Sequence, residues 1–107
     1  MLFDPLVSQI QQRLISTFHP QQMFLFGSRV YGSPREDSDY DLLVVVEKRS
    51  GSRIDNMLKA REALFDLDVS ADVFVYSEQE FEEWKNELNT VAEAAFVLGV
   101  ELPLGQP

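Results

Sequence analysis

A Gly-Ser pair and an Asp-x-Asp pair stand close together in this chain and constrain what it can fold into. Ten residues separate Gly27-Ser28 from Asp39 and Asp41, and the apolar run LLVVV follows at once. Two aspartates at i and i+2 on a strand point to the same face of a sheet. A Gly-Ser turn can place backbone N–H groups and a hydroxyl around a phosphate. Together these residues indicate a site for a nucleoside triphosphate and its divalent metal ions.

Apolar periodicity predicts alternating helices and strands. Apolar residues recur every four positions after Asp4-Pro5, a typical helix start, as far as His19-Pro20. Short apolar runs and helical spacings then predict strands at 23–26, 40–46 and 69–76, helices at 28–31 and from 54 to about 65, and a helical tail from Ser77 to Gly99. Two capping-box spacings in that tail, at Ser77 and Thr90, allow one helix or two. The chain is expected to form one domain, 1–107, of the α/β or α+β class, with a small mixed sheet of three or four strands flanked by helices.

Asp72 is the natural third member of the acidic site. It lies inside the apolar run of the third expected strand, where burying a charge is costly unless it is paired or metal-bound. A neighbouring strand could bring it beside Asp39 and Asp41, where three like charges repel unless a cation neutralises them. These three aspartates are therefore the expected catalytic and metal-binding residues, with Mg²⁺ as the ion. The alternative for Asp72 is an edge-strand aspartate that faces water.

The nucleotide itself is expected on the glycine turn and its surroundings. A side chain at Gly27 would block the close approach of a phosphate, and Ser28 opens a helix whose free N–H groups favour anions. Arg29 adds a positive charge there, or forms a surface ion pair. The expected nucleotide-binding residues are Gly27, Ser28, Arg29 and Ser38.

Three similar motifs can be rejected. Gly27 and Gly32 have the spacing of a P-loop, but Ser33 stands where that loop requires lysine. Asp37, Asp39 and Asp41 open like an EF-hand loop, but Leu42 replaces the turn glycine. A dimetal nuclease could use the same aspartates, but it would not need the Gly-Ser turn.

The charge distribution limits the partners. The net charge is −9, and residues 62–107 hold eleven Asp and Glu against one Lys. Such a surface suits nucleic acid poorly, so no nucleic-acid partner is expected. It suits a basic protein or a cationic small molecule, or it is simply a solvated acidic helix face. The chain has no membrane-length apolar stretch, no basic N-terminal region and no cysteine, so a cytoplasmic protein is expected without a membrane partner.

The string GSRVYGSPREDSDYDLLVVV resembles the signature of the minimal nucleotidyltransferases (MNT), small members of the polymerase-β-like superfamily. The resemblance implies that AMP passes from ATP to an acceptor hydroxyl with two Mg²⁺ ions and release of pyrophosphate. Asp39 and Asp41 would then bind both ions, and Asp72 would bind the catalytic ion and help to deprotonate the acceptor. Gly27 and Ser28 would hold the triphosphate. The sequence departs from the pattern at Val30-Tyr31, where the family often has Ala-Arg, and loses a cation there.

Short, acidic, stand-alone members of that family are often antitoxins. The resemblance to them implies a HEPN-domain toxin as the protein partner, with a tyrosine of the toxin as the AMP acceptor. One alternative is a binding module that neutralises its partner by contact alone. Another is adenylation of a small molecule of the antibiotic kind, although 107 residues leave little room for a second substrate domain.

Several other residues are expected to be structural. His19 stands at a helix end and is interpreted as a capping residue. Tyr40 alternates with the aspartates along the strand and is interpreted as a packing residue or a contact between strands. The apolar stripe of the tail places Phe81 and Trp84 in the core, or in a contact with a partner helix. Three cationic residues follow the second strand: Lys48, Arg49 and Arg53. They either contact the nucleotide or the acceptor, or they belong to a solvated loop.

Overall fold

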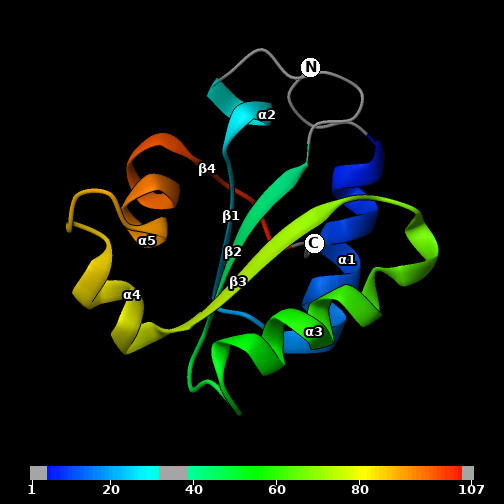
Figure 1. Cartoon of the computed structure of the whole chain (residues 1–107), viewed down its shortest axis with the longest axis horizontal. Helices are drawn as coiled ribbons and strands as arrows, with labels where there is room; N and C mark the ends of the chain where they lie inside the picture. The colour runs from blue at the N-terminus through cyan, green and yellow to red at the C-terminus, as the bar shows by residue number, and fades with distance from the viewer. Residues whose placement is uncertain (1–4, 32–38, 105–107) are drawn as a thin grey trace.

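A computed structural model of the chain describes residues 5–31 and 39–104. In chain order the elements are α1 (Pro5–Phe18), β1 (Gln22–Phe26), α2 (Ser28–Tyr31), β2 (Tyr40–Val46), α3 (Arg53–Ala63), η1 (Phe65–Leu67), β3 (Ala71–Ser77), α4 (Glu78–Trp84), α5 (Val91–Glu93), η2 (Ala94–Leu98) and β4 (Val100–Glu101). Figure 1 shows the strands crossing the centre of the molecule, with α1 and α3 on one side and α4 and α5 on the other. The expected mixed α/β architecture is confirmed.

The sheet brings the two sequence motifs to one end. Within the described residues it has four strands in the order β3-β2-β1-β4; β2 is antiparallel to β1 and parallel to β3. The end of β1 therefore meets the beginnings of β2 and β3. The short strand β4 pairs with Phe24 and Leu25 of β1. The sequence allows a fourth strand but does not locate it, because two residues are too few to produce a periodic pattern.

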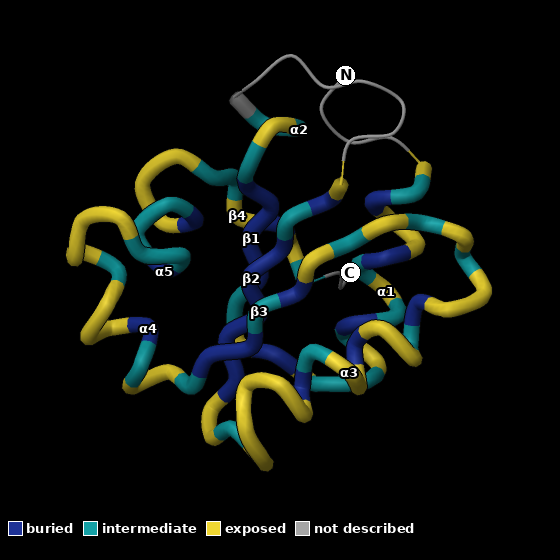
Figure 2. The backbone as a smooth tube through the Cα atoms, viewed as in Figure 1, coloured by how far each residue is buried: buried dark blue, intermediate teal, exposed yellow. Residues whose placement is uncertain are grey.

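Alternation along the strands divides the core in two. The face that carries Leu42 and Val44 packs against α1 and α3 through side chains such as Ile10 and Ala60. The opposite face, with Leu43 and Val45 among its buried residues, packs against α4, α5 and η2. Figure 2 shows buried backbone along the strands and exposed backbone along the outer turns of the helices. The continuous apolar run of β2 is thus explained by helices on both faces.

Local signals set the element boundaries. Helix α1 begins at Pro5 and ends before His19, whose φ of 50° turns the chain and whose N–H donates to the carbonyl of Ile15. The expected N-cap, Asp4, lies outside the described residues. Helix α3 begins at a capping box, in which Ser52 and Asp55 each accept a hydrogen bond from the other's backbone N–H. Helix α3 ends at Ala63, slightly earlier than the expected end near residue 65, and the short 3-10 helix η1 follows it.

The helical tail differs most from expectation. Thr90 caps a second helix through the N–H of Glu93, as its spacing indicated. The turn between α4 and α5 includes Asn89 in the left-handed region, so the apolar stripe is not continuous. Phe81 is buried as expected, but placing Trp84 in the core was wrong, because this side chain ends α4 and is 44% exposed. Among the described residues, none of the helices is both long and apolar enough to cross a membrane.

Candidate functional site

Gly27 ends β1 in a conformation that only glycine adopts without strain. Its φ is +83°, in the left-handed region. A Cβ added there would stand 2.1 Å from Oδ2 of Asp41, which is far closer than any real contact. Phe26 pairs with Asp41 in the antiparallel register, and this pairing accounts for the approach. The glycine therefore allows its backbone to lie directly against the Asp41 carboxylate.

Three aspartates share this end of the sheet. Asp41 stands opposite Asp72 in the parallel pairing of β2 with β3. Strand alternation turns both side chains to the face of α4 and α5, away from Tyr40 and Leu42. Asp39 directly precedes β2, two residues before Asp41, and is exposed, as is Asp72, while Asp41 is half-buried. The register thus joins the third aspartate to the Asp-x-Asp motif, as the sequence predicted.

The carboxylates of this cluster repel one another. Burial, and then repulsion from Asp72 and Asp39, raises the pKa of Asp41 above its ordinary value. Within the described parts of the chain, no Lys or Arg forms an ion pair with any of the three carboxylates. A hard divalent cation with oxygen ligands would supply the missing positive charge, and Mg²⁺ takes one or two carboxylates together with phosphate oxygens. The donor set therefore fits a magnesium-bound triphosphate.

The cluster is open in shape. No group of three or more His, Cys, Asp or Glu side chains within 5–31 and 39–104 gathers closely enough to enclose an ion. Asp39 and Asp72 are exposed, so their side chains can rotate toward Asp41 at little cost in packing. Two carboxylates and an incoming phosphate suffice for Mg²⁺, so a closed protein cage is not required.

The other expected nucleotide-binding residues lie around α2. Ser28 is exposed and opens this helix directly after Gly27. The guanidinium of Arg29 lies 3.9 Å from the ring centre of Tyr40, a cation–π contact, and Tyr40 is buried as a packing residue. Ser38 lies outside the described residues. Nucleotide binding by Ser28, Arg29 and Ser38 stays a prediction.

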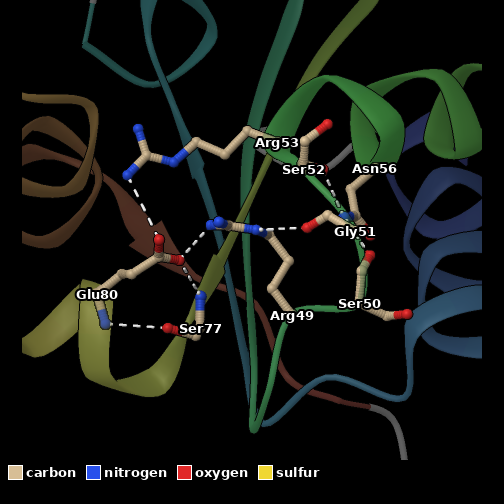
Figure 3. A network of polar contacts seen from close by, with 8 residues as sticks. All are labelled: Arg49, Ser50, Gly51, Ser52, Arg53, Asn56, Ser77 and Glu80. Carbon is tan, nitrogen blue, oxygen red and sulfur yellow. Dashed lines mark hydrogen bonds and ion pairs between the residues drawn. The ribbon is translucent and has the colours of Figure 1, made fainter.

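The cationic turn after β2 lies at the opposite end of the sheet. Figure 3 shows Glu80 held by Arg49 and Arg53, with Nη2 of Arg53 3.6 Å from Oε2 of Glu80. The Ser77 N–H donates to Glu80 over 2.8 Å. Although burial favours the neutral acid, these hydrogen bonds and charges hold the pKa of Glu80 below its ordinary value. Arg49 and Arg53 therefore link the turn to α4 at the end of the sheet away from the aspartates, and their contact with a nucleotide or acceptor stays a prediction. Lys48 lies at this same end.

The described surface has an open groove at one end of the sheet and a smaller cavity at the other. An open groove of about 720 Å³ adjoins the Arg49 and Glu80 network, at the end away from the aspartates. A smaller cavity of about 310 Å³ lies where the end of α3 and η1 meet the start of β3, and Asp72 is part of its lining. Arg61 and Phe65 line it too. This second cavity could not be predicted from the sequence, because its walls come from residues that have no motif in common.

Comparisons with known proteins show what this chain is similar to in sequence and in fold. Residues 8–78 match the profile of the family described as polymerase beta, nucleotidyltransferase. The crystal structure of a proposed nucleotidyltransferase from Sulfolobus solfataricus is similar in fold, with a TM-score of 0.57 and 25% sequence identity. That match covers 73% of this chain and 69% of the other. No protein of curated function matches the chain.

Proposed function

Because the chain belongs to the polymerase β nucleotidyltransferase family, we propose that it is a Mg²⁺-dependent enzyme that transfers AMP from ATP to an acceptor hydroxyl. The observation that supports this most directly is the end of the sheet itself. Gly27 lies against Asp41, and Asp72 stands opposite Asp41 in the register. Such a transfer needs a turn that binds phosphate and carboxylates that bind metal ions. Here two carboxylates are paired across the strands, and a third stands just before β2.

Each residue of the site has a role in this proposal. Asp39 and Asp41 would hold Mg²⁺, which when bound neutralises charge on the triphosphate. The backbone at Gly27 and Ser28 would hold the phosphates that leave. Asp72 would take the proton of the acceptor hydroxyl as its oxygen bonds to the α-phosphorus. The bond from that phosphorus to the bridging oxygen then breaks, and pyrophosphate leaves.

We further propose a protein acceptor, a tyrosine of a HEPN-domain toxin that this chain inactivates as an antitoxin. The resemblance to the minimal nucleotidyltransferases supports this partner, as does the acidic half of the chain, with eleven carboxylates against Lys85 in residues 62–107. That charge favours encounter with a basic protein. A positioned partner can complete the acceptor site of a small catalytic domain, since phosphoryl transfer depends chiefly on metals and positioning.

Label transfer tests the activity. The protein is mixed with ATP labelled in the α-phosphate, Mg²⁺ and lysate of the source cell, and compared with the Asp39→Asn/Asp41→Asn variant. The matched control is Glu62→Gln/Glu87→Gln, which removes the same two charges at exposed positions outside the site. Label on a protein band with the wild type and the control, but not with the aspartate variant, supports the proposal.

A second candidate is neutralisation by contact alone. Exposed apolar side chains on the helical tail favour it, among them Leu88 at 79% and Val97 at 57%. In this case the Asp39→Asn/Asp41→Asn variant would still protect cells fully from the partner. Full protection by a variant that transfers no label would refute the enzymatic account of neutralisation.

A further inference from the structure

Four large apolar side chains on the helical tail face solvent. They belong to the end of α4 and to η2, on the side of the sheet to which strand alternation turns Asp41 and Asp72. Their exposed fractions are 44% for Trp84, 43% for Phe96, 57% for Val97 and 53% for Leu98. Together these four residues form the tail surface. Contiguous exposed apolar side chains, unlike scattered ones, indicate contact with another molecule.

Contacts between α4 and η2 hold the two parts of the tail surface together. The rings of Phe81 and Phe96 pack edge to face, with their centres 5.8 Å apart. The Lys85 ammonium lies 4.8 Å from the centre of the Phe96 ring. Trp84 stands between Phe81 and Lys85 in the chain, and side chains three or four residues apart share one side of a helix. Trp84 therefore lies on the side of α4 that meets η2, and Figure 1 shows α4 and α5 together on that side of the sheet.

The tail surface begins beside the aspartate end of the sheet. A Cβ added at Gly99, the residue after Leu98, would stand 3.1 Å from Cβ of Phe26. Phe26 pairs with Asp41 and is followed directly by Gly27. The end of η2 is therefore packed against the strand that leads into the candidate site. A protein held on the tail surface would lie next to the aspartates, on the face of the sheet that two of their side chains share.

Most charges beside the tail surface are negative. Glu82 and Glu83 directly precede Trp84, and Glu93 ends α5 just before η2. Lys85 is the one cation of residues 62–107, and its ammonium lies 2.8 Å from a carboxylate oxygen of Glu82. Such a surface repels nucleic acid, anionic lipid headgroups and an identical surface on a second copy of the chain. A protein segment with basic and apolar side chains matches it in both respects.

From these contacts we infer that the tail surface binds a basic amphipathic segment of a partner protein. The apolar side chains of that segment cover Trp84, Val97 and Leu98, and its Lys and Arg side chains meet Glu83 and Glu93. The inference rests on the proposed function in one respect, because the partner is taken to be the protein acceptor. The docking itself uses none of the residues that are proposed to hold the nucleotide or the metal ions.

The single tryptophan of the chain reports binding at this surface. The probe is a synthetic amphipathic helix of leucine and lysine without aromatic residues, titrated into the protein while the emission of Trp84 is recorded. The emission should shift to shorter wavelengths and saturate, because docking removes the partly exposed indole from water. A helix with glutamate in place of each lysine should not bind, and salt should weaken binding of the lysine helix. Equal binding of the two helices would overturn the inference.

Paired substitutions locate the contact. Val97→Ser/Leu98→Ser should weaken binding of the lysine helix at least about tenfold and leave the melting temperature nearly unchanged, because both side chains are exposed. The matched control is Ile54→Ser/Leu58→Ser, since these side chains are 68% and 55% exposed on α3, on the other side of the sheet. The control should change binding by no more than about twofold. Binding that survives the tail variant, or that the control weakens equally, would overturn the inference.

Other occupants of the tail surface would give different results. A wild-type dimer that Val97→Ser/Leu98→Ser dissociates in analytical ultracentrifugation would assign the surface to a second copy of the chain. A shift of Trp84 emission on addition of neutral phosphatidylcholine vesicles would assign it to lipid. Either result would overturn the inference.

Transfer and docking can fail separately. The Asp39→Asn/Asp41→Asn variant should bind the lysine helix as tightly as the wild type does. Val97→Ser/Leu98→Ser should raise the KM for the protein acceptor and leave the affinity for Mg²⁺-ATP unchanged, and an unchanged acceptor KM would overturn the inference. If the wild type transfers no label, the proposed function fails, and the peptide titration still decides whether the tail surface binds a basic segment.

Discussion

Replacing Asp41 by Asn should abolish nucleotidyl transfer and yet stabilise the metal-free protein. Asp41 is half-buried, stands directly opposite Asp72 and has no described cationic partner, so its charge is unfavourable in the folded state. Cross-strand pairs in antiparallel sheets contribute about 0.2–1 kcal/mol and like charges there are destabilising, so we take a cost of this order for the parallel pair of Asp41 and Asp72. In a domain of this size, 1 kcal/mol shifts the melting temperature by roughly 4–8 °C. Asp41→Asn should therefore raise the melting temperature by a few degrees at neutral pH.

The pH dependence of stability tests independently whether the charge of Asp41 is destabilising. The folded pKa of Asp41 is raised, so the folded state binds protons more readily than the unfolded state. The cost is present in full above the raised folded pKa, and it disappears as the pH falls through that value toward the ordinary carboxyl pKa of about 4. The gap in stability between the variant and the wild type should therefore narrow on acidification.

Thermal unfolding followed by circular dichroism between pH 7 and pH 4 measures this gap, with Glu62→Gln as an exposed control. Mg²⁺ should raise the melting temperature of the wild type, because binding to the folded state stabilises it, and should raise that of Asp41→Asn less. A variant that is no more stable than wild type at pH 7, or a gap that widens in acid, would refute the repulsion at this site.

Two further variants probe the two ends of the sheet. Gly27→Ala should lose nucleotidyl transfer and about 1–2 kcal/mol or more of unfolding free energy, because the φ of Gly27 is left-handed and the new Cβ would clash with Asp41. Label transfer and urea unfolding measure these two losses. A variant as stable and as active as the wild type would contradict this geometry. Glu80→Ala should lose about 1 kcal/mol of unfolding free energy, because it removes the capping box of α4 and the ion pair with Arg49, and it should leave label transfer unchanged. A loss of transfer in this variant would contradict the separation of the Glu80 network from the site.

The sequence predicted those parts of the fold that local rules govern. The residues of β2 were predicted correctly, because a continuous apolar run leaves little choice, and the helix starts at Pro5 and Thr90 follow known capping chemistry. The position of Trp84 could not be predicted from the stripe, because the turn after α4 breaks the periodicity. The role of Arg49 depends on Glu80, which is far away in sequence and meets it only in the folded chain.

The same distinction applies to the candidate site. Spacing alone indicated Gly27, Asp39 and Asp41, since a turn and a strand place these residues locally. Asp72 could be proposed as the third aspartate only from the cost of its charge within an apolar run, and its position opposite Asp41 depends on the parallel register. The cavity that Phe65 lines has no local signal at all, because its walls come together only in the folded chain.

The two ends of the sheet differ in how the charges of their described residues are satisfied, and this contrast supports the proposed site. After β3, Glu80 has the Ser77 N–H and two arginines as partners, and its pKa is lowered. Before β2 and β3, Asp41 has the carboxylates of Asp39 and Asp72 and the backbone of Gly27 near it, no described Lys or Arg pairs with it, and its pKa is raised. Glu80 shows that this fold can surround a carboxylate with hydrogen-bond donors and cations. Selection for stability alone would therefore be expected to replace Asp41 by an uncharged residue. Departures from local consistency are expected where function requires them. A cationic ligand at this end of the sheet would relieve the repulsion that acts on Asp41.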